Sequence, residues 1–302
     1  MTAPVPQPGV LNITPYKGGE SSVAGVTQVR KLSSNESPLG PSPQAIATFG
    51  TMGKDLHRYP DGAVDALRQA LATKYDIEAE RIICSNGSDE LIGLLCAAYV
   101  GQGDEVLFNR HGFAMYPIST LARGATPVMA EENNYTVSVD ALLAAVSPRT
   151  KIVFLANPNN PTGTYISSGE VARLRDGLRP DILLVLDAAY AEYVNRNDYD
   201  AGIAMVRDAD NVIMMRTFSK IYGLAGLRVG WAYAPAEVVD VINRVRGPFN
   251  VNLVAQAVAT AALADDSWIE KARAHNDLWL PLMDAELRKL GLGTVPSVGN
   301  FL

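Results

Sequence analysis

The sequence predicts an α/β fold with a mainly parallel central sheet, helices on both of its faces, and a smaller second domain. Short segments that are apolar at nearly every position alternate with stretches of helical period, as in a parallel sheet buried on both faces. Beyond Pro235 only helical patterns follow, and 302 residues correspond to about two domains. We expect an N-terminal arm and part of the small domain at 1–42, a large domain at 43–246, and an incomplete helical linker and small domain at 247–302.

Composition narrows the class of protein. Hydrophobic residues make up 48% of the chain and charged residues 19%, which excludes intrinsic disorder. A formal charge of -6 argues against a large nucleic-acid surface and favours a small-molecule partner. The two cysteines, Cys84 and Cys96, lie in apolar runs and are expected to be buried thiols, and no zinc motif predicts a metal site. Without a leader or an apolar run of about 18 residues, the predicted location is the cytoplasm, away from membranes.

The elements follow in order along the chain. Proline and glycine are dense over 4–62, which predicts an extended arm and turns rather than a packed domain. Apolar runs predict strands at 81–84, 105–108, 126–129, 151–155, 182–186, 211–215 and 229–233. Helical periodicity predicts helices at 64–75, 89–99, 113–123, 139–146, 168–178, 236–246, 253–264 and 267–290. The last helix, with Trp268 and Trp279, is expected to form small-domain core.

Ligands of open α/β sheets bind beyond the carboxyl ends of the strands, so the residues that follow each strand are the candidates. After strand 81–84 comes a glycine-containing turn, 85–90, that opens a helix. Free backbone N–H groups and the helix dipole would hold an anion there, most simply a phosphate. The alternative is an ordinary N-cap by Ser88 or Asp89.

Two further strand ends carry polar side chains. After strand 151–155, the two prolines of segment 157–163 restrict the backbone and leave the amide of Asn160 as a fixed donor, with a plain turn as the alternative. Asp187 ends strand 182–186, where a carboxylate is costly unless it meets a cation or several donors. An N-cap is the alternative for Asp187, and a core position is the alternative for Tyr190.

The most reactive candidate follows strand 211–215. Lys220 lies among Phe218, Ile221 and other apolar residues, which is a poor place for a solvated charge. A partly desolvated lysine has a lowered pKa and becomes a nucleophilic amine that can condense with an aldehyde. Ser219 and Arg228 add phosphate ligands beside it. A surface lysine is the alternative.

These groups form a combination that is more specific than any one of them. An anion-binding turn, a fixed amide donor, a carboxylate with a nearby phenol, and an amine follow successive strands. Pyridoxal phosphate requires a phosphate cradle, a carboxylate for the pyridine nitrogen, donors to its phenolic oxygen and a lysine for its aldehyde. The sequence therefore predicts a pyridoxal-phosphate enzyme.

The chain closely resembles the fold-type-I pyridoxal-phosphate aminotransferases from about residue 9 to its end. The segments that carry the resemblance are 31–43, 57–62, 157–163, 186–193 and 217–228. Within this family it is most similar to the branch that acts on histidinol phosphate. The resemblance implies transamination of histidinol phosphate with 2-oxoglutarate, giving imidazole acetol phosphate and glutamate in histidine biosynthesis.

The resemblance also implies a role for each matching residue. Lys220 would bond to the cofactor aldehyde and later act as general base, Asp187 would pair with the pyridine nitrogen, and Asn160 and Tyr190 would bind the phenolic oxygen. The remaining matches are Ser88, Asp89, Ser219 and Arg228 around the phosphate, Phe113 stacked on the ring, and Asn35 and Tyr16 on the substrate side. Tyr59 matches a tyrosine that reaches the phosphate of the other subunit's cofactor, so a homodimer with composite sites is expected.

Two departures from the family pattern stand out. Ser37 occupies a position where asparagine is common. Relatives also continue past the equivalent of 295–302, into a segment that carries the arginine for the substrate's carboxylate or phosphate, so we expect a truncated chain, or a substrate anion held in another way. Near alternatives for the activity are an aromatic amino-acid aminotransferase and a threonine-phosphate decarboxylase. A module that holds pyridoxal phosphate without turnover is the alternative that is not an enzyme.

Overall fold

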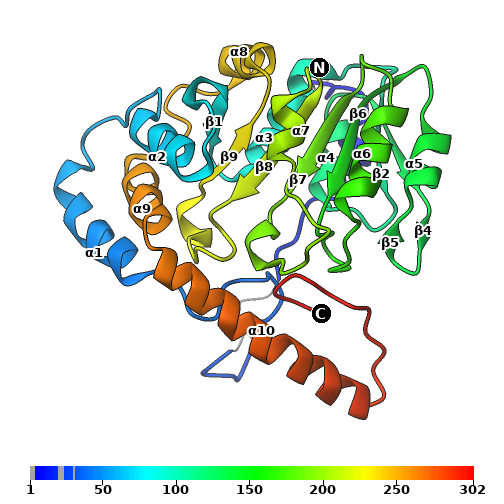
Figure 1. The fold of residues 1–302 in the computed structure, drawn as a ribbon. Helices are drawn as coiled ribbons and strands as arrows, with labels where there is room; N and C mark the ends of the chain where they lie inside the picture. The colour runs from blue at the N-terminus through cyan, green and yellow to red at the C-terminus, as the bar shows by residue number, and fades with distance from the viewer. Residues whose placement is uncertain (1–3, 20–23, 30) are drawn as a thin grey trace.

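The computed structural model describes residues 4–19, 24–29 and 31–302, and it has an α/β fold (Figure 1). A mixed β-sheet lies at the centre of the molecule. The described residues form a seven-stranded sheet in the order β1-β9-β8-β7-β6-β2-β3. Its strands are β1 (Ile82–Ser85), β2 (Glu105–Asn109), β3 (Thr126–Ala130), β6 (Thr150–Ala156), β7 (Leu183–Asp187), β8 (Val212–Thr217) and β9 (Gly230–Tyr233). A separate hairpin pairs β4 (Glu132–Asn133) with β5 (Thr136–Val137).

Strand direction decides where the functional residues gather. β9 runs antiparallel to both of its neighbours, β1 and β8, and the other paired strands of the sheet are parallel. Every strand except β9 therefore points the same way, and their carboxyl ends lie along one edge. This confirms the predicted mainly parallel sheet, with β9 as the exception.

Successive side chains of each strand serve two separate cores, because they point to opposite faces of the sheet. In β7, Leu184 and Leu186 join one buried cluster, whereas Leu183 and Val185 join the other. The first cluster is covered by α2 (Asp65–Tyr75), α5 (Val139–Ala145), α6 (Ser168–Gly177) and α9 (Leu253–Leu263). The second is covered by α3 (Ser88–Tyr99), α4 (Met115–Leu121) and α8 (Ala236–Val245). Cys84 and Cys96 are buried as predicted, and burial raises the pKa of both thiols to about 12.

The N-terminal region corrects the prediction of an extended arm over 4–62. Residues 43–51 form helix α1 (Pro43–Thr51), followed by the short 3-10 helix η2 (Met52–Asp55). The hydroxyl of Ser42 accepts from the N–H of Ala45 at 3.2 Å, and Pro43 fits the first helical turn, where its missing N–H is not needed. The cap and the proline at N1 are a helix-start signal that outweighs the surrounding glycines and prolines.

The C-terminal region is a long helix and a returning segment. α10 (Asp266–Lys289) extends past the edge of the sheet, and the segment after it turns back towards the sheet (Figure 1). There the N–H of Val298 donates to the carbonyl of Gly163 at 2.9 Å. Ile269 and Ala272 of α10 are buried, whereas Trp279 is 49% exposed, so in the described residues the expected core role holds only for the first half of the helix.

Shorter elements complete the described chain. They are η1 (Val10–Asn12), η3 (Ala79–Arg81), η4 (Ala191–Tyr193), α7 (Ile203–Arg207) and η5 (Ala225–Leu227). Within the described ranges, no helix combines the length and the apolar character needed to span a bilayer. The predicted division into domains at 42/43 and 246/247 stays a prediction.

Candidate functional site

A cavity of about 310 Å³ lies where the carboxyl ends of the strands meet. Most of the residues singled out from the sequence line it: Tyr16, Ser88, Asp89, Phe113, Asn160, Asp187, Tyr190, Ser219, Lys220 and Arg228. Ser34, Glu36, Met115, Thr217 and several small residues complete the wall. Ser88, Phe113, Asn160, Asp187, Ser219 and Lys220 lie at or after the carboxyl ends of β1, β2, β6, β7 and β8, so the common strand direction brings them together. Tyr16, Ser34 and Glu36 come from the N-terminal segment, and Arg228 precedes β9.

Lys220 supplies the amine of the cavity. It follows β8 in a tight turn, and its Nζ donates to the carbonyl of Ser34 at 3.0 Å and lies 5.4 Å from the centre of the Tyr190 ring. Burial lowers the pKa of Lys220, and the charges of Glu36 and Asp187 oppose that shift only in part. The surface-lysine alternative is therefore wrong, and the amine is poised to act as a nucleophile or a base.

Asp187 supplies a carboxylate with one free oxygen. Its side chain is buried, its Oδ2 accepts from the hydroxyl of Tyr116 at 2.8 Å, and its Oδ1 has no hydrogen-bond partner among the described residues. Burial raises the pKa of Asp187, and the Tyr116 hydrogen bond only partly offsets this. The residue caps no helix, so that alternative is wrong. A buried, unpaired carboxylate oxygen fits a cationic N–H, such as a protonated pyridine nitrogen.

The start of α3 forms the anion end of the cavity. The helix is capped by Gly87, at φ +84°, with no side-chain hydrogen bond, so the predicted alternative of a cap by Ser88 or Asp89 is wrong. Arg228 donates to Asp89 at 2.5 Å and to the hydroxyl of Ser219 at 3.3 Å. Uncapped N–H groups, a guanidinium and a hydroxyl thus converge, as a bound phosphate requires.

The same end has no room for larger side chains. A Cβ at Gly87 would lie 2.2 Å from Nη2 of Arg228, and a Cβ at Gly230 would lie 2.5 Å from the backbone N of Ser88. Both glycines let the backbone of the turn and of β9 approach the helix N-terminus. This close-packed cradle and the free oxygen of Asp187 fit the two ends of pyridoxal phosphate.

The walls between these ends are aromatic and amide side chains. Phe113 lines the cavity from the loop after β2 and meets Tyr116 edge to face at 5.9 Å. The hydroxyl of Tyr190 accepts from the amide of Asn35 at 3.0 Å, and burial raises the pKa of Tyr190 well above its usual range. Tyr190 is buried but faces the cavity, so the core-only alternative is wrong. Asn160 also lines the cavity.

The loops that carry these walls are fastened from outside the cavity. Asn109, the backbone N–H of His111 and the His111 ring all contact the carboxylate of Glu132, which is buried. Burial pushes the pKa of Glu132 up, but the hydrogen bonds from Asn109 and His111 outweigh it and hold this pKa below its usual value. The amide of Asn159 then donates to the carbonyl of His111 at 3.0 Å, which ties the Phe113 loop to the Asn160 loop.

Two predicted residues do not line the cavity. Asn35 reaches it only through its hydrogen bond to Tyr190. Tyr59 is 82% exposed and stacks on Phe249 at 4.8 Å, away from the cavity of its own chain. Sequence reasoning in turn missed Tyr116, which contacts Asp187. On a helix, three residues after Phe113, this tyrosine resembles any core aromatic, so no sequence signal could have separated it.

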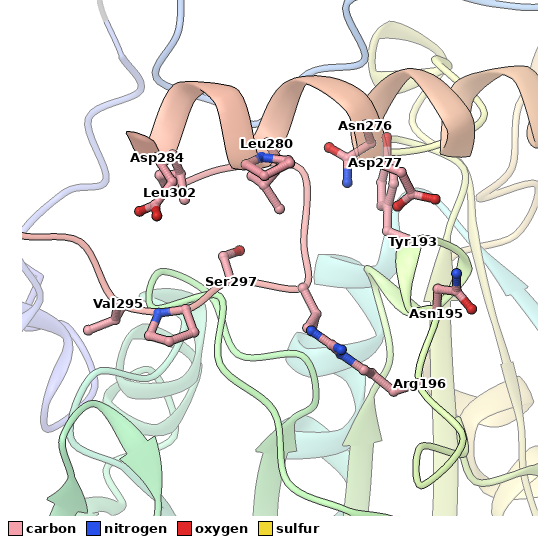
Figure 2. A pocket seen from close by; sticks show the side chains of 13 residues that line it. Tyr193, Asn195, Arg196, Asn276, Asp277, Leu280, Asp284, Val295, Ser297 and Leu302 are labelled. Carbon is pink, nitrogen blue, oxygen red and sulfur yellow. The ribbon is translucent and has the colours of Figure 1, made fainter. Parts of the chain in front are cut away.

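A larger cavity of about 460 Å³ lies elsewhere, between α10 and the C-terminal segment. Figure 2 shows Asn276, Leu280 and Asp284 of α10 on one wall and Val295 and Ser297 of the C-terminal segment on the other. It contains none of the residues predicted from strand ends. The carboxylate of Asp284 is hydrogen-bonded to Arg288 and Thr294.

The chain matches the family described as aminotransferase class I and II over residues 27–302. Along its whole length it is 58% identical to the histidinol-phosphate aminotransferase of Paramagnetospirillum magneticum and 53% identical to that of Rhodospirillum centenum, and it covers 83% of each.

A solved structure shares the fold. The crystal structure of histidinol-phosphate aminotransferase from Sinorhizobium meliloti in complex with pyridoxal-5'-phosphate superposes with a TM-score of 0.83 at 30% identity. The match covers 88% of this chain and 72% of that one.

Proposed function

The chain belongs to the aminotransferase class I and II family, and on that premise we propose that the strand-end cavity is the site of a pyridoxal-phosphate-dependent transamination of histidinol phosphate. Relatives with 53% and 58% identity are named for that substrate. The amino acceptor we propose is 2-oxoglutarate, so that the products are imidazole acetol phosphate and glutamate. The observation that carries the proposal is the pairing, in one cavity, of a desolvated amine and a buried carboxylate with a free oxygen.

Each predicted residue has a place in this proposal. Lys220 would hold the cofactor covalently, the unpaired oxygen of Asp187 would accept from its ring nitrogen, and Phe113 would pack against the ring. Asn160 and Tyr190 bind the phenolic oxygen. Ser88, Asp89, Ser219 and Arg228, with the N–H groups of α3, surround the phosphate, and Tyr16 and Asn35 border the substrate side.

Bound pyridoxal phosphate supplies an aldehyde for the substrate amine and a cationic ring that accepts the electrons left when a proton departs. The chain's own groups then move and hold protons. The Nζ of Lys220, once free, takes the proton from the substrate's α-carbon, because its lowered pKa makes the neutral base accessible. Asp187 keeps a proton on the ring nitrogen, and Tyr190 donates from its hydroxyl, since burial disfavours its ionised form.

One experiment tests the reaction and its substrate. The chain is loaded with pyridoxal phosphate, and the cofactor absorbance is followed during titration with histidinol phosphate, phenylalanine and threonine phosphate. We expect a complete shift at the lowest concentration of histidinol phosphate. A stronger response to either other donor overturns the proposed substrate, and an absorbance that no donor changes supports a module that only holds the cofactor.

A second experiment tests whether Lys220 bonds to the cofactor. Borohydride reduction followed by peptide mass spectrometry should tag Lys220. Lys220→Ala should lose the tag and the turnover, whereas Lys289→Ala, at an exposed ion pair at the end of α10, should keep both. Turnover in the Lys220→Ala variant overturns the assignment.

We also propose a homodimer in which Tyr59 completes the partner's site. The exposure of Tyr59, and of Ile46, Phe49 and Leu56 nearby in the chain, supports a second copy packing against this region. Inactive Tyr59→Ala and Lys220→Ala chains, mixed under conditions that exchange subunits, should regain activity, because each hybrid dimer has one intact composite site. Mixtures that stay inactive although hybrids form contradict the composite site.

A further inference from the structure

Tyr116 is a buried residue with a polar contact to the centre of the site. It lies in α4 and is fully buried, and its hydroxyl donates to Oδ2 of Asp187 at 2.8 Å. Neither the strand-end pattern nor the residues carried over from the resemblance include it. Among the described residues, the Tyr116 hydroxyl is the one side-chain group that donates a hydrogen bond to the Asp187 carboxylate, and Oδ1 of that carboxylate has no partner there.

The ring of Tyr116 is fixed on several sides. It stacks on Phe154 of β6 with centroids 4.5 Å apart and planes 4° apart, and it meets Phe108 and Phe113 at 5.8 Å and 5.9 Å. Gly112 completes the contact, since a Cβ there would lie 3.3 Å from the ring of Tyr116. A ring held this tightly can aim its hydroxyl in only one direction, which is towards Asp187.

We propose that Tyr116 is a positioning residue for the proposed reaction: its hydroxyl donates to one oxygen of Asp187, so that the carboxylate stays ionised and its other oxygen stays unpaired for the cofactor's ring nitrogen. The inference rests on the proposed function, and it adds a residue that sets the charge and orientation of Asp187. Tyr116 itself touches neither substrate nor cofactor in this role.

The charges around Asp187 explain why a fixed donor matters there. Burial raises the pKa of Asp187, and the Tyr116 hydroxyl, the N–H of Ala189 and the Lys220 amine oppose that rise, whereas Asp89 adds to it. Tyr190 lines the same cavity, and the charge of Asp187 adds to the rise of the Tyr190 pKa. In the proposed reaction Lys220 changes its charge, but Tyr116 does not, because burial and the charge of Asp187 raise the pKa of its phenol far beyond its usual value.

Removing only the hydroxyl of Tyr116 separates its hydrogen bond to Asp187 from the packing of its ring. Tyr116→Phe keeps the stacked ring but leaves Oδ2 without its donor, so the pKa of Asp187 rises further. The ionised carboxylate is the form that binds a cationic ring nitrogen. As pH falls, binding of pyridoxal phosphate should therefore be lost at a higher pH in the variant than in the wild type.

The test compares the full chain with Tyr116→Phe and with Tyr75→Phe. Tyr75 is the matched control, because its hydroxyl contacts that of Tyr222 at 3.2 Å outside the cavity. The readouts are the dissociation constant of pyridoxal phosphate, measured by fluorescence across pH, and the half-reaction with histidinol phosphate. We expect binding about ten- to a hundredfold weaker and an acid limb at higher pH in Tyr116→Phe, and neither effect in Tyr75→Phe.

A double-mutant cycle excludes a merely structural role. If Tyr116 acts through Asp187, adding Tyr116→Phe to Asp187→Asn should weaken cofactor binding no further. Additive losses, or an acid limb that does not move in Tyr116→Phe, overturn the proposal. A wild-type chain that binds pyridoxal phosphate but responds to no amino donor would instead contradict the proposed function, whatever the binding curves of the variant show.

Discussion

Asp187→Asn should make the ligand-free chain more stable while it removes activity. The wild-type carboxylate is buried, and one of its oxygens lacks a partner among the residues that the structure describes. A buried polar atom without a partner costs about 1–3 kcal/mol, and more when it is charged. Asparagine still leaves a polar atom without a partner there, but it removes the buried charge and its oxygen can accept from Tyr116, so we expect a gain of about 1–3 kcal/mol, which is a rise of roughly 2–6 °C in Tm.

The pH dependence of that gain follows from linkage. Burial raises the pKa of Asp187 in the folded chain above its unfolded value, so between the two values the folded chain binds more protons than the unfolded chain. The stability of the wild type therefore falls as pH rises through this window, which begins near the unfolded value of about 4. The advantage of Asp187→Asn should be absent below the window and complete at neutral pH.

The activity should move in the opposite direction. A carboxylate and a protonated ring nitrogen about 4 Å apart interact by about 4 kcal/mol at an effective dielectric constant of 20. If that interaction is fully expressed in the transition state, its loss costs about three decades of rate. The fold should stay intact, because asparagine has nearly the same shape.

Two measurements check the predicted gain in stability and the predicted loss of activity. Thermal unfolding of the ligand-free chain is followed at several pH values, and turnover is measured in parallel. Asp181→Asn is the control, because its carboxylate lies in an exposed ion pair with Arg179, where we expect little change in Tm. A variant at position 187 that is less stable than the wild type at neutral pH would refute the burial argument. Unchanged turnover would refute the role of the charge.

Three further predictions test the surroundings of the site. Gly230→Ala should weaken binding of pyridoxal phosphate and destabilise the chain by about 1–3 kcal/mol, because its Cβ would press on the backbone N of Ser88 at the start of α3. Gly93→Ala, within α3 and with open space around it, should be neutral or stabilising. Equal effects of the two substitutions in binding titrations and denaturant unfolding would contradict the proposed phosphate cradle. Glu132→Gln should cost about 1–3 kcal/mol in denaturant unfolding and change the fluorescence of bound cofactor. The amide oxygen can keep the hydrogen bonds from Asn109 and from the N–H of His111, but the amide nitrogen in place of Oε2 cannot accept from the His111 ring, and the negative charge is lost; an unperturbed variant would show that this clamp does not hold the Phe113 loop. Cys84 and Cys96 should react with a thiol reagent only on unfolding, because burial raises both thiol pKa values to about 12, and rapid labelling of the native chain would contradict their burial.

Most of the sheet could be predicted because its strands are continuous apolar runs. The strands expected at 182–186 and 211–215 are observed as Leu183–Asp187 and Val212–Thr217. The direction of β9 could not be predicted, since residues 230–233 are equally apolar for either direction. α7 and the β4–β5 hairpin were missed because elements this short show no periodicity. α1 lies in a stretch rich in glycine and proline, which favours turns and hides the helix start that Ser42 and Pro43 signal.

The site could be located from the sequence to the extent that its residues follow strands. The rule that ligands bind beyond the carboxyl ends of parallel strands brings Ser88, Asn160, Asp187 and Lys220 into one cavity without any knowledge of packing. Contacts between side chains of different helices and strands could not be predicted in this way. The hydrogen bond from Tyr116 to Asp187 depends on how α4 packs on β6, and no spacing along the chain encodes that distance.

The groups that make the cavity reactive also lower the stability of the ligand-free chain. Lys220 is a desolvated amine, Asp187 has an unpaired buried oxygen, and α3 begins without a side-chain cap. Each would be replaced if stability alone were selected, and each finds a partner in a ligand that carries an aldehyde, a cationic ring nitrogen and a phosphate. Binding of such a ligand to the folded chain therefore supplies stability that the chain lacks without it, by mass action. Local defects that one ligand corrects together indicate a binding site more strongly than the volume of a cavity, which is why we propose the smaller cavity at the strand ends, rather than the larger one beside α10, as the site.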